Sequence, residues 1–342
     1  MCNCDWNTRN LYFVRLGLML MVVFYHSILF WTGRWFNAVG LPVFTNEYFP
    51  VVAKWFISFL MEAFTLVSGY LFYYLNFECK RYESLYKYFK IKTLRLLVPY
   101  ISVAFFWVIP VSYFFYKWSF QKIIDKYVLG LAPSQLWYLL MLFNVSLLAY
   151  ACKKIFLKHT FFSLLLVSVL YVHGLQGWRF TLNYFMVHTS LKYLIFFLIG
   201  FKIRQFRCKN IKFFSVLILF LLHTTLFYLM NFTDICDSGR YGRLFFNLSL
   251  NILGAVWIFL LLMKLGKIFP CESNKLLLGL SENSMGIYLL HQQIIYFCIF
   301  LFNGEVDSLC NALINFILSI LISLVIICYL KKYKTGRFIL GE

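Results

Sequence analysis

The sequence predicts an all-α integral membrane protein, with about ten transmembrane helices in one bundle and both termini in the cytoplasm. Three observations support this. Of the 342 residues, 62% are hydrophobic and only 13% are charged, far from the composition of soluble domains. Apolar stretches of membrane-spanning length recur along the chain. Basic residues gather in alternate loops between these stretches.

Most of the apolar stretches are long enough to cross ~30 Å of hydrocarbon as a helix. They are residues 11–31, 50–75, 94–116, 134–152, 160–173, 189–205, 211–231, 245–263, 284–302 and 309–330. The first is too long for the apolar region of a signal peptide, and we interpret it as the first helix. The fifth is the shortest, and we keep it because the loop charges then alternate consistently.

The charge of the chain fits this topology. The net charge is +19, from 32 Lys and Arg against 13 Asp and Glu. In a soluble chain this excess would indicate nucleic-acid binding. With ten spans, however, 22 of the 32 basic residues lie on one side and eight on the other, as expected when the cytoplasmic loops are the more basic.

We therefore expect one membrane domain over residues 1–342, in the inner (cytoplasmic) membrane of the cell. Membrane lipid is an expected partner and nucleic acid is not. Ten scattered cysteines show no CxxC pair and no Cys/His ligand spacing, so the sequence predicts neither a metal site nor a bound cofactor.

Two polar residues stand out in the first span. Arg15 and His26 are separated by ten residues, nearly all of them apolar. Eleven helical steps make about three turns, so the two side chains share one face, with His26 ~16 Å deeper than Arg15. Taken singly, Arg15 could be an interfacial anchor and His26 an interhelical hydrogen-bond partner.

Their pairing on one face suits a thioester donor that enters from the cytoplasm. Coenzyme A carries phosphates at one end and its acyl group at the end of a long, thin arm. Arg15 would hold phosphate, and His26 would act near the thioester as general base. An acyl-histidine intermediate is the alternative, and the sequence does not separate the two.

The second span carries Glu62, and a carboxylate inside a span is a functional candidate. The alternative is that it pairs with Lys54 or Arg34 in the outer half of the membrane. Ser68 and the glycine after it favour close helix packing more than chemistry.

Histidines also occur in two later spans. His291 is a second intramembrane candidate, with a packing hydrogen bond as the equal alternative, whereas the packing interpretation dominates for His223. Lys92 and Arg95 belong to a basic cluster at the start of the third span. They indicate contact with lipid headgroups, and are compatible with a phosphate-binding wall opposite Arg15.

Six motifs in order along the chain resemble the acyltransferase 3 family of multi-pass membrane acyltransferases. They are Arg15-x10-His26, Phe64-x3-Ser68-Gly69-Tyr70, Lys92-x2-Arg95-Leu-x2-Pro99-Tyr100, Leu136-Trp137-Tyr138-Leu139, Phe197-Leu-Ile-Gly200-Phe201 and Ser284-x-Gly286-Ile287-Tyr288-Leu-Leu-His291. Each motif is weak alone, but the ordered set is specific and spans essentially the whole chain.

The resemblance implies transfer of an acyl group, most often acetyl, from cytoplasmic acyl-coenzyme A to a hydroxyl of a cell-envelope or exported glycan, or of its lipid-linked precursor. It implies that His26 is catalytic and that Arg15 binds the donor phosphates. The family's basic motif maps onto Lys92 and Arg95, and its late motif onto Tyr288 and His291.

The chain departs from the family pattern at two places. Glu62-Ala63 stands where many members have Pro or an apolar residue, and Gln135 stands where many have His. The identity of the acceptor is therefore less transferable than the donor chemistry. The chain also lacks the extracytoplasmic domain of larger members, so any envelope partner is expected to be a separate protein.

A transporter or flippase is the competing hypothesis. His26, Glu62 and His291 would then form a proton or substrate path through the bundle. Such a protein favours inverted repeats or helices broken by Gly or Pro, and the sequence shows neither.

Overall fold

A computed structural model describes the chain except residues 1–5, 34, 83, 177–181, 208–211 and 235–238. The described residues form an all-helical protein without named strands. The α-helices are α1 (Trp6–Ile28), α2 (Tyr48–Ile57), α3 (Leu60–Tyr73), α4 (Leu85–Lys92), α5 (Val98–Val103), α6 (Ile109–Tyr116), α7 (Phe120–Ile123), α8 (Trp137–Ala151), α9 (Lys153–Lys158), α10 (Thr160–Gln176), α11 (Val187–Gln205), α12 (Phe213–Phe232), α13 (Gly239–Ile268), α14 (Lys275–Glu282), α15 (Ser284–Phe302), α16 (Ser308–Leu330) and α17 (Lys334–Ile339).

Nine helical segments of the described chain are long and apolar enough to cross a membrane. They match nine of the ten predicted stretches, and the all-helical membrane class is confirmed. The remaining stretch, 160–173, is helical as α10, but its 17 residues make a helix of only ~25 Å. It packs beside α11 as a short apolar helix.

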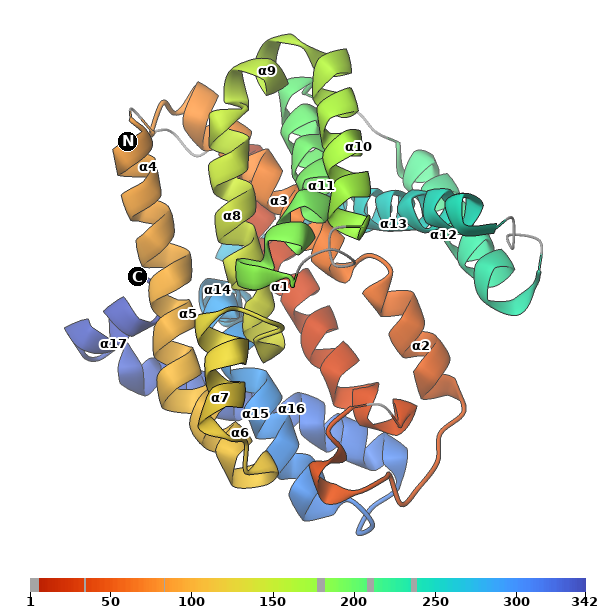
Figure 1. The fold of residues 1–342 in the computed structure, drawn as a ribbon, viewed down its shortest axis with the longest axis vertical. Coiled ribbons are helices and arrows are strands. Elements are labelled where there is room, and N and C mark those ends of the chain that lie inside the picture. The colour runs from red at the N-terminus through yellow and green to blue at the C-terminus, as the bar shows by residue number, and fades with distance from the viewer. Residues whose placement is uncertain (1–5, 34, 83, 177–181, 208–211, 235–238) are drawn as a thin grey trace.

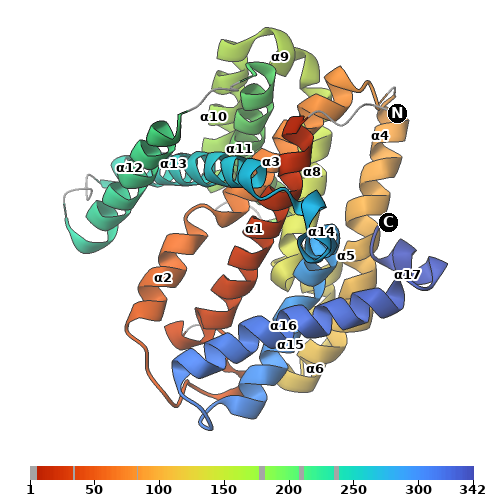
Figure 2. The same cartoon turned by 180° about the vertical axis from the view of Figure 1, so that it is seen from behind.

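Helix α1 lies at the centre of the fold. It packs against α3, α13, α15 and α16, and Figures 1 and 2 show these elements around it from opposite sides. The helix that carries Arg15 and His26 is therefore enclosed by other helices along much of its length.

The second predicted span is bent, which the sequence did not predict. It divides into α2 and α3 at Ser58 and Phe59. The Ser58 hydroxyl donates to the carbonyl of Trp55, at 2.6 Å, so its oxygen accepts from Nε2 of His223, at 3.0 Å. His223 is fully buried, and this confirms its packing role: it stabilises the bend from α12.

The third predicted span belongs to a longer helix, Leu85–Tyr116, which contains two π-helical turns. Each turn comes just before a proline: Thr93–Leu97 precedes Pro99, and Ala104–Val108 precedes Pro110. A proline has no N–H to donate to the carbonyl four residues earlier, and its ring clashes with that carbonyl. The extra residue of a π turn accommodates the proline without ending the helix.

Helices α3 and α11 pack closely through two glycines. A Cβ atom on Gly69 would collide with the carbonyl oxygen of Phe197, and one on Gly200 would collide with that of Leu66. The backbones therefore approach as small residues allow in membrane bundles. Both glycines belong to the motifs that suggested the family.

Helices α12 and α13 form a pair that extends away from the other helices (Figure 1). Many large apolar side chains of α12 are exposed, including Phe214, Leu221 and Tyr228. Exposed apolar surface of this kind suits contact with lipid.

The glycine contact gives a stability prediction. We expect Gly200→Ala to reduce the free energy of unfolding by about 1–3 kcal/mol, because the methyl group must push two backbones apart. Gly279→Ala is the matched control, since a Cβ there meets no atom within 4 Å. Thermal denaturation of the two purified variants measures this difference, and equal midpoints would contradict the packing argument.

Candidate active site

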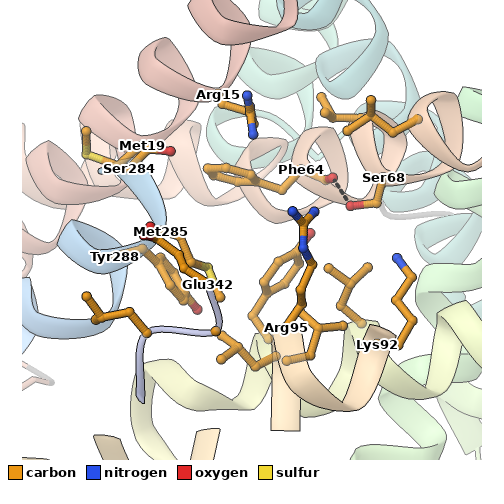
Figure 3. Close-up of a pocket in the computed structure, with 18 of the residues that line it drawn as sticks. Arg15, Met19, Phe64, Ser68, Lys92, Arg95, Ser284, Met285, Tyr288 and Glu342 are labelled. Atoms are coloured by element: carbon orange, nitrogen blue, oxygen red, sulfur yellow. Dashed lines mark hydrogen bonds between the residues drawn. The ribbon is translucent and has the colours of Figure 1, made fainter. Parts of the chain in front are cut away.

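A cavity of about 330 Å³ lies between α1, α3, α8, α15 and the helix that carries Lys92 and Arg95. Figure 3 shows Arg15 on one side of it and Lys92 and Arg95 on the other. The three basic residues that the sequence analysis assigned to donor binding thus line one cavity. Like charges repel at short range, and the carboxylates of Glu282 and Glu342 in the same lining offset part of this repulsion. The cavity still has three basic residues against two acidic ones, which favours an anionic ligand.

Arg15 is held in the wall of the cavity by an aromatic contact. Its guanidinium carbon lies 4.9 Å from the ring centroid of Tyr12, a distance typical of a cation–π interaction. Its Nε is buried and has no hydrogen-bond partner. No ion pair of Arg15 is formed within the described part of the chain. A half-buried guanidinium with an unused N–H donor is suited to binding an anion.

The π turn before Pro99 carries Arg95, and a distant segment packs against it. Pro99 has no N–H to donate to the carbonyl of Arg95. Gly341, in the left-handed region at φ +79°, lies so close that a Cβ would be 3.1 Å from this carbonyl oxygen and 2.7 Å from Pro99. Glu342 lines the cavity and pairs with Lys331 at 2.6 Å. The sequence analysis missed this segment because no local pattern predicted its position.

His26, which is half-buried, and His291 form a pair deeper in the bundle. Nε2 of His291 lies 3.3 Å from Nδ1 of His26, and His291 is fully buried. Nδ1 of His26 is also 2.9 Å from the carbonyl of Val22, and Nδ1 of His291 is 2.8 Å from that of Tyr288. Among the described residues, no three His, Cys, Asp or Glu side chains gather as metal ligands.

The carbonyls define which nitrogens carry protons. A carbonyl oxygen only accepts, so Nδ1 is protonated in both neutral rings. The N–H of His26 is then shared between the carbonyl of Val22, at 2.9 Å, and the lone pair on Nε2 of His291, at 3.3 Å. Nε2 of His26 also keeps its lone pair, as a general base requires. This arrangement resembles the logic of catalytic triads, in which a second group orients the base.

Aromatic rings connect the cavity to this pair. Tyr138 and Tyr288 both line the cavity, with ring centroids 6.2 Å apart, and the ring of Tyr288 is 5.9 Å from that of His291. The Tyr288 hydroxyl donates to the carbonyl of Gln135, whose amide donates to Gln293 at 2.6 Å. Gln135 therefore joins the 3-10 turn Ser134–Leu136, just before α8, to α15.

Of the two remaining candidates, Ser68 lies in the cavity lining and Glu62 lies outside it. Ser68 lines the cavity, and its hydroxyl donates to the carbonyl of Phe64, at 3.0 Å (Figure 3). Glu62 is buried outside the cavity lining and accepts from the hydroxyl of Tyr193, at 3.3 Å. Its alternative partner Lys54 is exposed and forms no ion pair with it, whereas Arg34 lies outside the described residues.

The fold and the site define a multi-pass membrane protein with a basic cavity beside a histidine pair. Residues 9–330 match the model of an acyltransferase domain. The chain belongs to the acyltransferase 3 family, as its motifs indicated, and membrane acyltransferase activity is the general function this supports. No curated protein and no solved structure matches the chain.

The unused donor of Arg15 leads to a binding prediction. Inorganic pyrophosphate should raise the thermal midpoint of the purified protein, with stabilisation of about 2.7 kcal/mol at 100 times Kd. Arg15→Gln should remove most of this effect. Lys122→Gln is the control, because Lys122 lies over Trp118 away from the cavity. Equal stabilisation of both variants would place the bound anion elsewhere.

Proposed function

We propose that this protein transfers an acyl group, principally acetyl, from cytoplasmic acyl-coenzyme A to a hydroxyl of a cell-surface or exported polysaccharide or of its lipid-linked precursor. The observation that carries the proposal is the pairing of one basic cavity with one histidine pair on the same two helices. α1 carries Arg15 and His26, and α15 carries Tyr288 and His291. A rigid helix holds both parts of the site at a constant separation.

The cavity supports binding of the donor's phosphates. Arg15, Lys92 and Arg95 approach it from two helices. Guanidinium groups bind phosphate through paired N–H donors, while the ammonium of a lysine acts as a compact charge. We assign these three residues to the phosphates of acyl-coenzyme A, as a co-substrate and not as a resident cofactor.

The depth of His26 supports a role at the acyl group. Eleven helical steps separate it from Arg15, which corresponds to ~16 Å. The arm of coenzyme A spans a distance of that order, so phosphate bound at Arg15 leaves the thioester near Tyr288 and the histidines. His26 is the base and His291 its positioning residue.

The chemistry then follows from the lone pair on Nε2 of His26. This nitrogen takes the proton of the acceptor hydroxyl as the oxygen attacks the thioester carbonyl. The C–S bond breaks, the new ester forms, and the thiolate of coenzyme A receives the proton. In the alternative route the acyl group passes through Nε2 itself, and burst kinetics would distinguish the two.

The topology that this function needs has the donor side in the cytoplasm. We propose ten spans, with α10 as the short one, both termini cytoplasmic, and location in the inner membrane. The excess of basic residues in the loops on the Arg15 side supports this orientation. A separate envelope protein would accept or present the product where the acceptor is not lipid-linked.

Removing His26 tests the proposed chemistry. We expect His26→Ala to lower acyl transfer by about 10²–10⁴-fold, the usual effect of losing a general base. Transfer from labelled acetyl-coenzyme A in membrane vesicles measures this, together with mass spectrometry of envelope polysaccharide. His159→Ala is the control, since His159 is an exposed histidine. Undiminished acylation in the His26 variant at normal protein levels would refute the assignment.

The positioning role of His291 gives a second kinetic prediction. His291→Phe keeps a ring but removes one of the two acceptors for the N–H of His26, leaving the carbonyl of Val22. Because His26 is then less well oriented, kcat should fall about tenfold while KM for the donor stays near wild type. His291→Gln should recover part of kcat, because its amide oxygen accepts the same proton. A rise in KM with unchanged kcat would instead indicate a role in binding.

A further inference from the structure

Two side chains of the cavity wall leave a buried polar atom without a hydrogen-bond partner. One is Arg15, through Nε, and the other is Tyr138, through its hydroxyl oxygen. Tyr138 is 7% exposed. A buried hydroxyl without a hydrogen-bond partner destabilises a folded protein, and such groups are uncommon.

The side chains around the Tyr138 hydroxyl form no strong hydrogen bond with it. Its polar neighbours Thr65 and Ser68 both donate their protons to carbonyls of their own helix, at 2.9 Å and 3.0 Å. Both side chains interact with the Tyr138 hydroxyl at longer range, but neither forms a hydrogen bond of normal geometry with it. The nearby Tyr288 differs, because its hydroxyl already donates to the carbonyl of Gln135. Tyr138, in the cavity lining, thus keeps a buried O–H donor without a hydrogen bond of normal geometry.

Tyr138 lies between the basic residues of the cavity and the histidine pair. It lines the cavity together with Arg15 and Arg95, and its ring packs 6.2 Å from Tyr288, which in turn contacts His291. A ligand that reached from the cations to the histidine pair would pass this hydroxyl. The remaining contacts there are largely apolar, from side chains such as Met19 and Met285.

We propose that Tyr138 is a donor-binding residue, whose hydroxyl donates to an amide carbonyl in the arm of acyl-coenzyme A. This rests on the proposed function, because it takes acyl-coenzyme A as the donor. The arm is apolar apart from its amides, and an amide carbonyl buried beside methionine and aromatic side chains requires a hydrogen-bond donor. Tyr138 supplies that donor part of the way along the arm, leaving the thioester beyond it.

The test compares two probes on the purified full chain. Coenzyme A has phosphates and the arm, whereas adenosine 3′,5′-bisphosphate has phosphates alone. We expect Tyr138→Phe to weaken coenzyme A binding about five- to tenfold, the size of one buried hydrogen bond, and to leave binding of the bisphosphate unchanged. Arg15→Gln should weaken both probes. Isothermal titration calorimetry measures six affinities, those of wild type and the two variants for each probe.

A stability control separates binding from packing. Tyr138→Phe removes a hydroxyl without a partner, so its thermal midpoint should equal or exceed that of wild type. Tyr100→Phe, outside the cavity lining, removes a hydroxyl that donates to the carbonyl of Tyr127 at 2.7 Å. That variant should lose stability and keep its affinity for coenzyme A.

The outcomes distinguish this proposal from the one on which it rests. Wild-type affinity of Tyr138→Phe for coenzyme A would overturn the role of Tyr138 and leave the proposed function standing. Equal weakening of both probes, or a Tyr138→Phe chain that is destabilised or fails to fold, would assign the hydroxyl to structure and also overturn it. If the wild-type protein binds neither probe, the proposed donor itself is wrong.

Discussion

The arrangement of this protein depends on one constraint: a polar side chain inside a membrane bundle must find its partner within the protein. Most of the polar groups here meet it by joining helices. His223 binds Ser58 at the bend of the second span, and Gln135, in the turn just before α8, binds Gln293 of α15. These contacts place the helices around α1 and so create the cavity in which Arg15 has an unused donor.

The same constraint explains how much of the site the sequence could predict. A charged or imidazole side chain in an apolar stretch is visible without any structure, and Arg15, His26 and His291 were all identified in this way. The helical repeat then placed Arg15 and His26 on one face, and α1 lies at the centre of the bundle. Glu62 was equally visible, but its bond to Tyr193 lies outside the cavity.

Other features depend on contacts between residues that are far apart in the chain. The bend at Ser58 needs His223, and the cavity needs the segment around Gly341 against the turn of Arg95. Tyr138 belongs to a recognised motif, yet its hydroxyl is found to lack a hydrogen bond of normal geometry only once every neighbour is placed. Local patterns carry no information about such contacts, so a single sequence predicts the spans and the charged residues better than the walls of the site.

The separation of the cations from the histidine pair has a physical rationale under the proposed function. Phosphates carry charge that is costly to move into a medium of low dielectric constant, whereas a thioester on a thin arm is neutral. An enzyme that keeps the phosphates at Arg15, Lys92 and Arg95 needs to move only the neutral end deep into the bundle. The acyl group can then reach His26 without a charged group crossing the interior, and the helices need open only a narrow path.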